Sequence, residues 1–291
     1  MGVFARALKY SITGVATGTF LLASSELASA SGAGAVPATM TWPHTGVTTT
    51  YDYAAVRRGF SVYKQVCSAC HSMKFLSFRH LINVTHTEAE VKEMAAEYEI
   101  EHDAPNEQGE MYMRARTTND NFPAPYPNEI AARLGNNGAL PPDLSLIRNA
   151  RTHEMDFHYG EDYIFHLLTG YMDPPAGVEI AEGMHYNPYF KGGAIGMAAP
   201  LYPEIIQYDD GTVPTLSQLA SDVSQFLTWS SMKHDDERKS NILKMWPAVF
   251  VFMVGAIMAK KNDWAGLKPS NYQFRNLKQK TSGMYNGKPR Y

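Results

Sequence analysis

The sequence predicts a mainly α-helical domain with long loops, followed by one C-terminal transmembrane helix. Apolar residues recur at spacings of three and four in several stretches, which is the period of a helix that buries one face. The 17 prolines and 22 glycines of the 291-residue chain indicate long loops between these stretches. An apolar run of 18 residues near the C-terminus is long enough to cross a membrane.

Residues 1–36 have the pattern of a targeting segment. Arg6 and Lys9 precede an apolar stretch from Ile12 to Ala23, and Ala28-Ser29-Ala30 offers a small-residue cleavage site. The apolar stretch is shorter than the about 20 residues that a spanning helix needs. A sorting signal is therefore the favoured interpretation, and an N-terminal anchor kept in the mature protein is the alternative.

The motif Cys67-Ser68-Ala69-Cys70-His71 contains the only two cysteines of the chain. Two thiols at this spacing can add to the two vinyl groups of one haem, while the next histidine reaches the iron. The motif therefore predicts one covalent haem c. A zinc site is an alternative, but its remaining ligands would have to be histidines, and a redox thiol pair does not need His71. The stretch before Cys67 predicts a helix whose apolar face is formed by Val56, Phe60, Tyr63 and Val66.

A second amphipathic helix is predicted from Glu88 to Ile100, with Thr87 as its N-cap and Glu90 completing a capping box. Nine acidic residues and one lysine lie between Glu88 and Glu110. These acids form either a solvated face or a docking patch for a basic partner. The basic residues of the chain cluster instead after the apolar run and have no folded module of their own, so no nucleic-acid partner is predicted.

The region from Pro105 to Pro142 is rich in proline and is predicted to form loops. A short helix from Asp143 to Ala150 leads to Arg151. An arginine beside a buried haem is a natural partner for a propionate, because guanidinium binds carboxylates bidentately. Another helix is predicted from Glu161 to Leu168.

Met197 is the candidate for a second iron ligand. The chain has fifteen methionines, and most of them must fill gaps in the core. Met197 differs because it lies in a loop-rich stretch flanked by glycines and a proline. A methionine opposite the histidine raises the reduction potential and closes the iron to oxygen chemistry.

The C-terminal part begins with a predicted helix at 215–230, which has Thr215 as its N-cap. The apolar run from Ile242 to Ala259 follows a charged stretch, and Trp246 suits an interfacial aromatic belt. Eight basic residues and one aspartate lie between Lys260 and Tyr291. This asymmetry indicates a stop-transfer anchor, with the basic tail on the cytoplasmic or matrix side. A buried core helix is the alternative.

Several longer stretches carry a resemblance to a known family. The chain resembles the cytochrome c1 family, the haem subunits of mitochondrial ubiquinol–cytochrome c reductase (respiratory complex III). The similarity runs from about Trp42 to Lys268. The stretches that carry it are Arg57-Arg58-Gly59-Phe60, 63–67, Cys70-His71-Ser72-Met73, 105–107, 109–111, NNGALPPDLS at 136–145, 167–171, 187–190 and 194–198.

The resemblance implies a class I c-type cytochrome fold with long loops, in which the helix before the haem motif crosses the helix at 215–230. It also implies a role for individual residues. Cys67 and Cys70 would carry the thioethers, and His71 and Met197 would be the axial iron ligands. Other haem contacts implied are Arg151 and Tyr163 in the propionate region, and Asn136 and Pro141 in the haem pocket.

The implied function is that of a one-electron carrier, which accepts electrons from the Rieske iron–sulfur protein and passes them to soluble cytochrome c. Cytochrome b and a second copy of the complex are further expected partners. The expected organisation is a targeting segment at 1–36, a haem domain at 37–240 in the intermembrane space, a transmembrane anchor at 241–260 and a basic matrix-side tail at 261–291 of the mitochondrial inner membrane. A membrane-anchored c-type domain of another oxidase or dehydrogenase is the rival, but it would lack the long matching stretches.

Three features depart from the family pattern. The stretch 152–159 is longer than the family's usual turn, which makes the alignment of Tyr163 less certain than that of Arg151. The tail beyond Lys268 does not match. The N-terminal segment is shorter than a typical two-part presequence.

Overall fold

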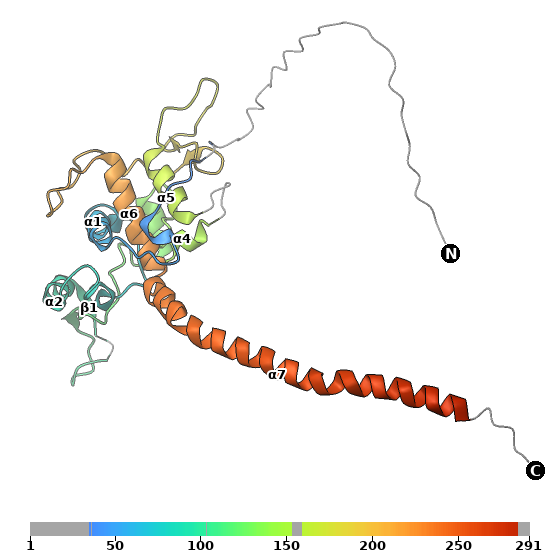
Figure 1. Cartoon of the computed structure of the whole chain (residues 1–291). Helices are drawn as coiled ribbons and strands as arrows, with labels where there is room; N and C mark the ends of the chain where they lie inside the picture. The colour runs from blue at the N-terminus through green and yellow to red at the C-terminus, as the bar shows by residue number, and fades with distance from the viewer. Residues whose placement is uncertain (1–34, 36, 103, 153–158, 285–291) are drawn as a thin grey trace, which may run out of the picture. The chain divides into compact units, whose positions relative to one another are not determined.

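The computed structural model describes residues 35, 37–102, 104–152 and 159–284, with side chains up to residue 265 (Figure 1). The predicted targeting segment, apart from residue 35, and the core of the 152–159 insertion therefore lie outside the described residues.

Helices dominate the described part of the chain, and long loops connect them, which confirms the predicted class. Two small antiparallel pairs of strands complete the fold: β1 (Glu99–Glu101) pairs with β2 (Met113–Ala115), and β3 (His185–Tyr186) with β4 (Ala194–Ile195). The α-helices are α1 (Tyr53–Gln65), α2 (Glu88–Ala96), α3 (Glu129–Gly135), α4 (Ile147–Ala150), α5 (Gly160–Thr169), α6 (Leu216–Ser231) and α7 (Asp235–Met284), and the short 3-10 helices are η1 (Pro43–Thr45), η2 (Cys67–Ala69) and η3 (Phe78–Leu81).

Helix α6 forms the centre of the domain, packing against α1 and against α4 and α5 (Figure 1). The predicted N-cap is present, because the Thr215 hydroxyl accepts a hydrogen bond from the backbone of Gln218. Helices α1 and α6 approach closely at Gly59, where an added Cβ would lie 2.0 Å from the carbonyl oxygen of Asp222. The expected crossing of these two helices is thus made possible by a residue without a side chain.

An ion pair fixes the same crossing. Arg58 on α1 donates from Nε and Nη2 to the two carboxylate oxygens of Asp222 on α6, at 3.0 and 3.1 Å. The side chain of Asp222 is fully buried and also accepts from Gln218. A buried carboxylate is costly unless it is paired and hydrogen-bonded, so the two helices have one favourable register.

The helix predicted from Glu88 to Ile100 is shorter than expected. It begins as predicted, with the Thr87–Glu90 capping box, but α2 ends at Ala96. Ile100 instead pairs with Arg114 in the strand pair β1–β2. The prediction of a longer helix was wrong because this pairing depends on residues far along the chain, which local periodicity does not report.

Two further differences concern the region around residue 140. Helix α3 interrupts the predicted loops and begins where the Asn128 side chain accepts a hydrogen bond from the backbone of Ala131. The helix predicted from Asp143 shrinks to α4, because the Asp143 carboxylate accepts hydrogen bonds from Lys74 and Ser72 rather than starting a helix. The second difference ties this region to the chain that follows the C-x-x-C-H motif.

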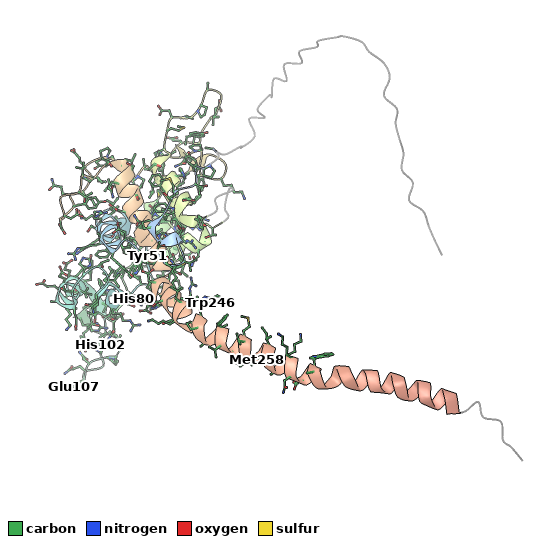
Figure 2. The ribbon with its side chains drawn as sticks, viewed as in Figure 1. Tyr51, His80, His102, Glu107, Trp246 and Met258 are labelled. Carbon is green, nitrogen blue, oxygen red and sulfur yellow. The ribbon has the colours of Figure 1, made fainter. Side chains whose placement is uncertain are left out.

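Helix α7 contains the predicted transmembrane run. Within it, Asp235–Ala265 is the one helical segment of the described chain that is long and apolar enough to cross a membrane, and none of its most apolar stretch is buried. Trp246 and Met258 project from the helix into open space (Figure 2). The helix is therefore not a core helix of this chain. Its first turn is tied to the domain, since Tyr53 donates to the Asp236 carboxylate at 2.8 Å.

The crossing at Gly59 can be tested by adding one methyl group. We expect Gly59→Ala to lower the free energy of unfolding by about 1–3 kcal/mol, because the methyl overlaps the backbone of α6 and forces the helices apart. Thermal unfolding of the full chain in detergent measures this. Gly255→Ala in α7 is the matched control, since its added Cβ meets no atom within 4 Å. Equal stability of the two variants would contradict the prediction.

Candidate functional site

The ring of His71 is held in one tautomer. Helix α1 ends just before Cys67, and the following turn is closed by a hydrogen bond from the backbone of His71 to the carbonyl of Cys67. Nδ1 of His71 lies 2.8 Å from the carbonyl oxygen of Pro142. A carbonyl can only accept, so Nδ1 carries the proton and Nε2 keeps its lone pair. Burial also lowers the pKa of His71, which favours the neutral ring that an iron ligand must be.

The two cysteines are free thiols and partly buried. Burial, and to a smaller extent the neighbouring Cys70, raises the pKa of Cys67 to about 12. A redox-active cysteine needs a lowered pKa, so this environment does not suit that role. Among the residues with described side chains, no three His, Cys, Asp or Glu groups converge on a possible metal position. The zinc and thiol alternatives therefore gain no support, whereas the thiols fit thioether attachment.

The segment 136–145 runs alongside the motif. The backbone of Leu144 donates to the carbonyl of Ser72 at 2.9 Å, and the Asp143 carboxylate accepts from the Ser72 hydroxyl. Pro141 is partly buried in this segment. The side chain of Asn136, in contrast, donates to the carbonyl of Ala132 and to the hydroxyl of Tyr126, so it closes the end of α3.

The same segment also meets the loop that carries Met197. An added Cβ on Gly196 would lie 3.1 Å from the Cβ of Ala139, so the two backbones are in close contact. Met197 itself is partly buried and follows directly after β4 and Gly196. The backbone from 139 to 142 thus contacts Gly196, which precedes Met197, and also contacts the ring of His71.

Arg151 and Tyr163 lie together, as the resemblance implies. The guanidinium of Arg151 lies over the ring of Tyr163, with Cζ 5.7 Å from the ring centroid. Tyr163 is buried on α5. Arg148, the other arginine of this region, donates from Nε to the Glu161 carboxylate at 2.6 Å. Arg148 is thus used in a structural ion pair, whereas Arg151 lies over the ring of Tyr163.

Glu161 is fully buried and is a residue that the sequence reasoning missed. Burial raises its pKa, but hydrogen bonds from His44 and Arg148 more than offset this and hold the pKa below its ordinary value. The neighbouring Asp162 accepts from the indole of Trp42 at 2.6 Å. These bonds join η1 to α4 and α5 and so position Tyr163. No local pattern marks Glu161, because a carboxylate near the start of a helix is usually exposed.

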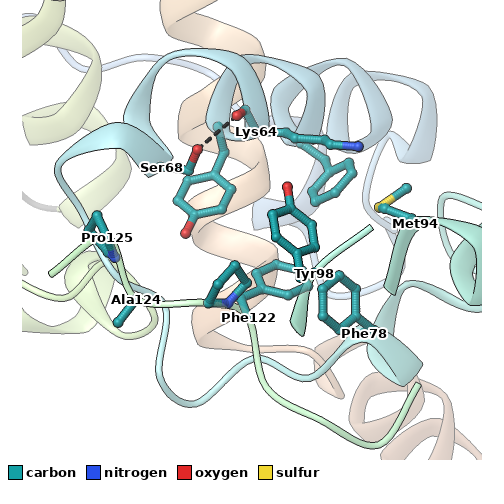
Figure 3. Close-up of a pocket in the computed structure, with 11 residues that line it drawn as sticks. Lys64, Ser68, Phe78, Met94, Tyr98, Phe122, Ala124 and Pro125 are labelled. Atoms are coloured by element: carbon teal, nitrogen blue, oxygen red, sulfur yellow. Dashed lines mark hydrogen bonds between the residues drawn. The ribbon is translucent and has the colours of Figure 1, made fainter. Parts of the chain in front are cut away.

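One cavity near the motif, of about 230 Å³, does not coincide with these residues (Figure 3). It lies between α1, α2, η3 and the proline-rich loop 122–125, and Ser68 is its only contribution from the motif. The Ser68 hydroxyl is turned back to the carbonyl of Lys64. None of the eight predicted haem residues lines this cavity. Five of the eleven residues that line it are aromatic: Phe60, Tyr63, Phe78, Tyr98 and Phe122.

Comparison with known proteins agrees with the predicted family. A family model described as the Cytochrome C1 family matches residues 42–267. Cytochrome c1-2, heme protein, mitochondrial, of Solanum tuberosum is 49% identical over 227 residues, which cover 78% of this chain and 85% of that protein. The cytochrome b-c1 complex catalytic subunit, mitochondrial, of Candida albicans is 45% identical over 267 residues, or 90% of each chain. Cytochrome c1, heme protein, mitochondrial, of Saccharomyces cerevisiae is 48% identical over 234 residues, which cover 80% of this chain and 74% of that protein.

The chain therefore belongs to the cytochrome c1 family. The matched region has nearly the same limits as the resemblance found in the sequence, which is thereby confirmed.

The buried Arg148–Glu161 pair can be tested by removing its cation. We expect Arg148→Met to lower the free energy of unfolding at neutral pH by about 3–5 kcal/mol, because it leaves a buried carboxylate without its guanidinium. The double variant Arg148→Met/Glu161→Gln should recover much of the loss. Chemical denaturation of the full chain in detergent measures both.

The same pair has a defined pH dependence. The pKa of Glu161 is lowered in the folded state, so its contribution is present above the ordinary carboxyl pKa of 4.5 and is lost as the pH falls through the folded value. The difference between wild type and Arg148→Met should therefore shrink on acidification. A difference that does not change with pH, or a double variant no more stable than the single one, would contradict this account.

Proposed function

We propose that this chain carries single electrons on one covalently bound haem c, as a subunit of a quinol–cytochrome c reductase of the mitochondrial inner membrane. One observation carries the proposal. The segment 136–145 fixes the tautomer of His71 through the Pro142 carbonyl and also packs against Gly196, next to Met197. Such an arrangement suits a planar group bound between two axial side chains. The names of the relatives, among them a heme protein and a subunit of the cytochrome b-c1 complex, support the cofactor and the assembly.

The proposed roles follow the chemistry of each side chain. Haem c supplies a one-electron iron couple when it is bound. Cys67 and Cys70 would hold it by thioethers, and His71 Nε2 and the Met197 sulfur would be its iron ligands. Arg151, beside Tyr163, neutralises a propionate. Pro141 contributes to the wall of the pocket, and Asn136 supports that wall by closing α3.

The direction of electron flow and the partners complete the proposal. The chain receives electrons from the Rieske iron–sulfur protein and passes them to soluble cytochrome c, beside cytochrome b in a dimeric complex. Two axial side chains leave no open iron position for a substrate, which supports a relay role. Exposed carboxylates on β1 and the loop after it support docking of a basic partner, and Glu107 lies at the far end of this region (Figure 2).

In the proposed membrane arrangement, the haem domain, 37–240, lies in the intermembrane space and the tail, 261–291, lies in the matrix. The exposed apolar side chains along α7 support a span at 241–260, because such a surface is stable in lipid and costly in water. Lys260 and Lys261 at its end support the matrix side for the tail. Residues 1–36 act as the targeting segment, which N-terminal sequencing of the mature chain tests.

The assignment of Met197 can be tested by its replacement. We expect Met197→Leu to keep the covalent haem, because the thiols are untouched. It should lower the midpoint potential by on the order of hundreds of millivolts, since axial ligands set haem potentials over about 0.8 V. A redox titration followed by visible spectra measures this. Met73→Leu, at a buried packing methionine, is the control. An unchanged potential in Met197→Leu would show that another group is the ligand, and absence of a haem c spectrum in the wild type would contradict the cofactor.

The docking surface can be tested by charge reversal. Glu99 and Glu101 are exposed, and no ion pair joins them to another described side chain. We expect Glu99→Lys/Glu101→Lys to slow reduction of soluble cytochrome c at low ionic strength, with the difference fading as salt is added. Glu179→Lys/Glu182→Lys makes the same charge change on another exposed loop and is the control. Equal rates for the two variants at low salt would show that the acids of β1 are a solvated surface and do not dock the partner.

A further inference from the structure

The loop that carries Met197 is held by a tyrosine hydroxyl. Tyr171 donates a hydrogen bond to the backbone carbonyl of Met197 at 3.1 Å. It is the one hydrogen bond that Met197 makes to any described residue. A tyrosine hydroxyl is protonated at neutral pH, so Tyr171 remains a donor. The two residues are 26 positions apart in the chain, and no sequence motif predicts that they are in contact.

The end of α5, directly before Tyr171, is held in place by two contacts. Tyr171 follows Gly170 at the end of α5, where an added Cβ would lie 2.4 Å from the ring of Tyr189. The buried side chain of Asn187 donates to the carbonyl of Leu167 at 2.7 Å, which ties the end of α5 to the chain that follows β3. The hydroxyl therefore acts from a rigid support, and a hydrogen bond from a rigid donor restrains its acceptor.

The two predicted ligands differ in how firmly the fold holds them. His71 is next to Cys70 in the chain, its ring is bound by Pro142, and its carbonyl accepts from the hydroxyl of Tyr63 at 3.3 Å. Met197 has no covalent neighbour of this kind. Loss of one hydrogen bond is thus expected to matter more for Met197 than for His71.

We propose that Tyr171 is a positioning residue for the axial methionine, which keeps the Met197 sulfur in place by holding the carbonyl of the same residue. This rests on the proposed function, in which Met197 is the ligand. Tyr171 touches neither the iron nor the electron partners in this role. It shifts the equilibrium between the state in which the Met197 sulfur is bound and the state in which it is released. An added ligand can bind only in the released state.

The test is the binding of imidazole to the oxidised, haem-loaded full chain in detergent. Tyr171→Phe keeps the ring and removes only the hydroxyl. We expect it to lower the apparent dissociation constant for imidazole about fivefold, which corresponds to the loss of one ordinary hydrogen bond. Tyr51→Phe is the matched control, since Tyr51 also donates to a methionine carbonyl, that of Met232, outside the site. It should bind imidazole like the wild type.

Met197→Leu in the same assay separates the two proposals. If this variant binds imidazole tightly while Tyr171→Phe behaves like the wild type, the positioning role is overturned and the ligand assignment stands. If the wild type already binds as tightly as Met197→Leu, the ligand assignment itself fails.

A second measurement guards against a general loss of structure. The charge-transfer absorption of a sulfur–iron bond should fade at a lower temperature in Tyr171→Phe than in the wild type. The helical circular dichroism of the two should be lost at the same temperature. Simultaneous loss of both signals, at one lowered temperature, would show a merely structural role and overturn the proposal.

Discussion

The close crossing of α1 and α6 is the constraint on which the rest of the domain depends. Helix α1 leads into the C-x-x-C-H motif, and α6 leads into the membrane helix, so their contact joins the cofactor end of the chain to its anchor. Gly59 lets the backbones approach, and the Arg58–Asp222 pair selects one register. Helices α4 and α5 pack on the same α6, and Tyr163 lies on α5. The position of Tyr163 therefore depends on this crossing as well.

Buried charges then specify how the loops are arranged around this pair of helices. Arg148 and Glu161 join α4 to α5, and His44 joins η1 to the same carboxylate. Burying these charged groups costs desolvation free energy, which their hydrogen bonds only partly offset. These pairs fix the position of the loops because their hydrogen bonds are directional. An apolar contact tolerates a shift of the loop, whereas a paired carboxylate does not. Long loops without regular structure need this kind of fixation if they are to form a site of defined shape.

The sequence predicted those features that depend on neighbouring residues. The spacing of Cys67, Cys70 and His71 is local chemistry, and the caps at Thr87 and Thr215 are local geometry. The end of α2 at Ala96, the strand pairs and the short α4 were not predicted, because long-range partners decide them. Among fifteen methionines, Met197 was singled out by its setting between glycines and a proline, and the family resemblance supplied the stronger argument. The contributions of the Pro142 carbonyl and the Tyr171 hydroxyl were missed because they are contacts between distant segments.

The site thus combines two kinds of support. On the histidine side, the motif and the end of α1 lie in one short stretch of chain, so local sequence specifies much of it, and the distant Pro142 carbonyl adds one contact to the ring. On the methionine side, the position of Met197 depends on β3–β4, on Ala139 and on Tyr171, which are brought together only by the complete fold. An axial methionine raises the reduction potential only while it stays bound. The part of the site that we propose sets the potential is therefore the part that depends most on tertiary structure.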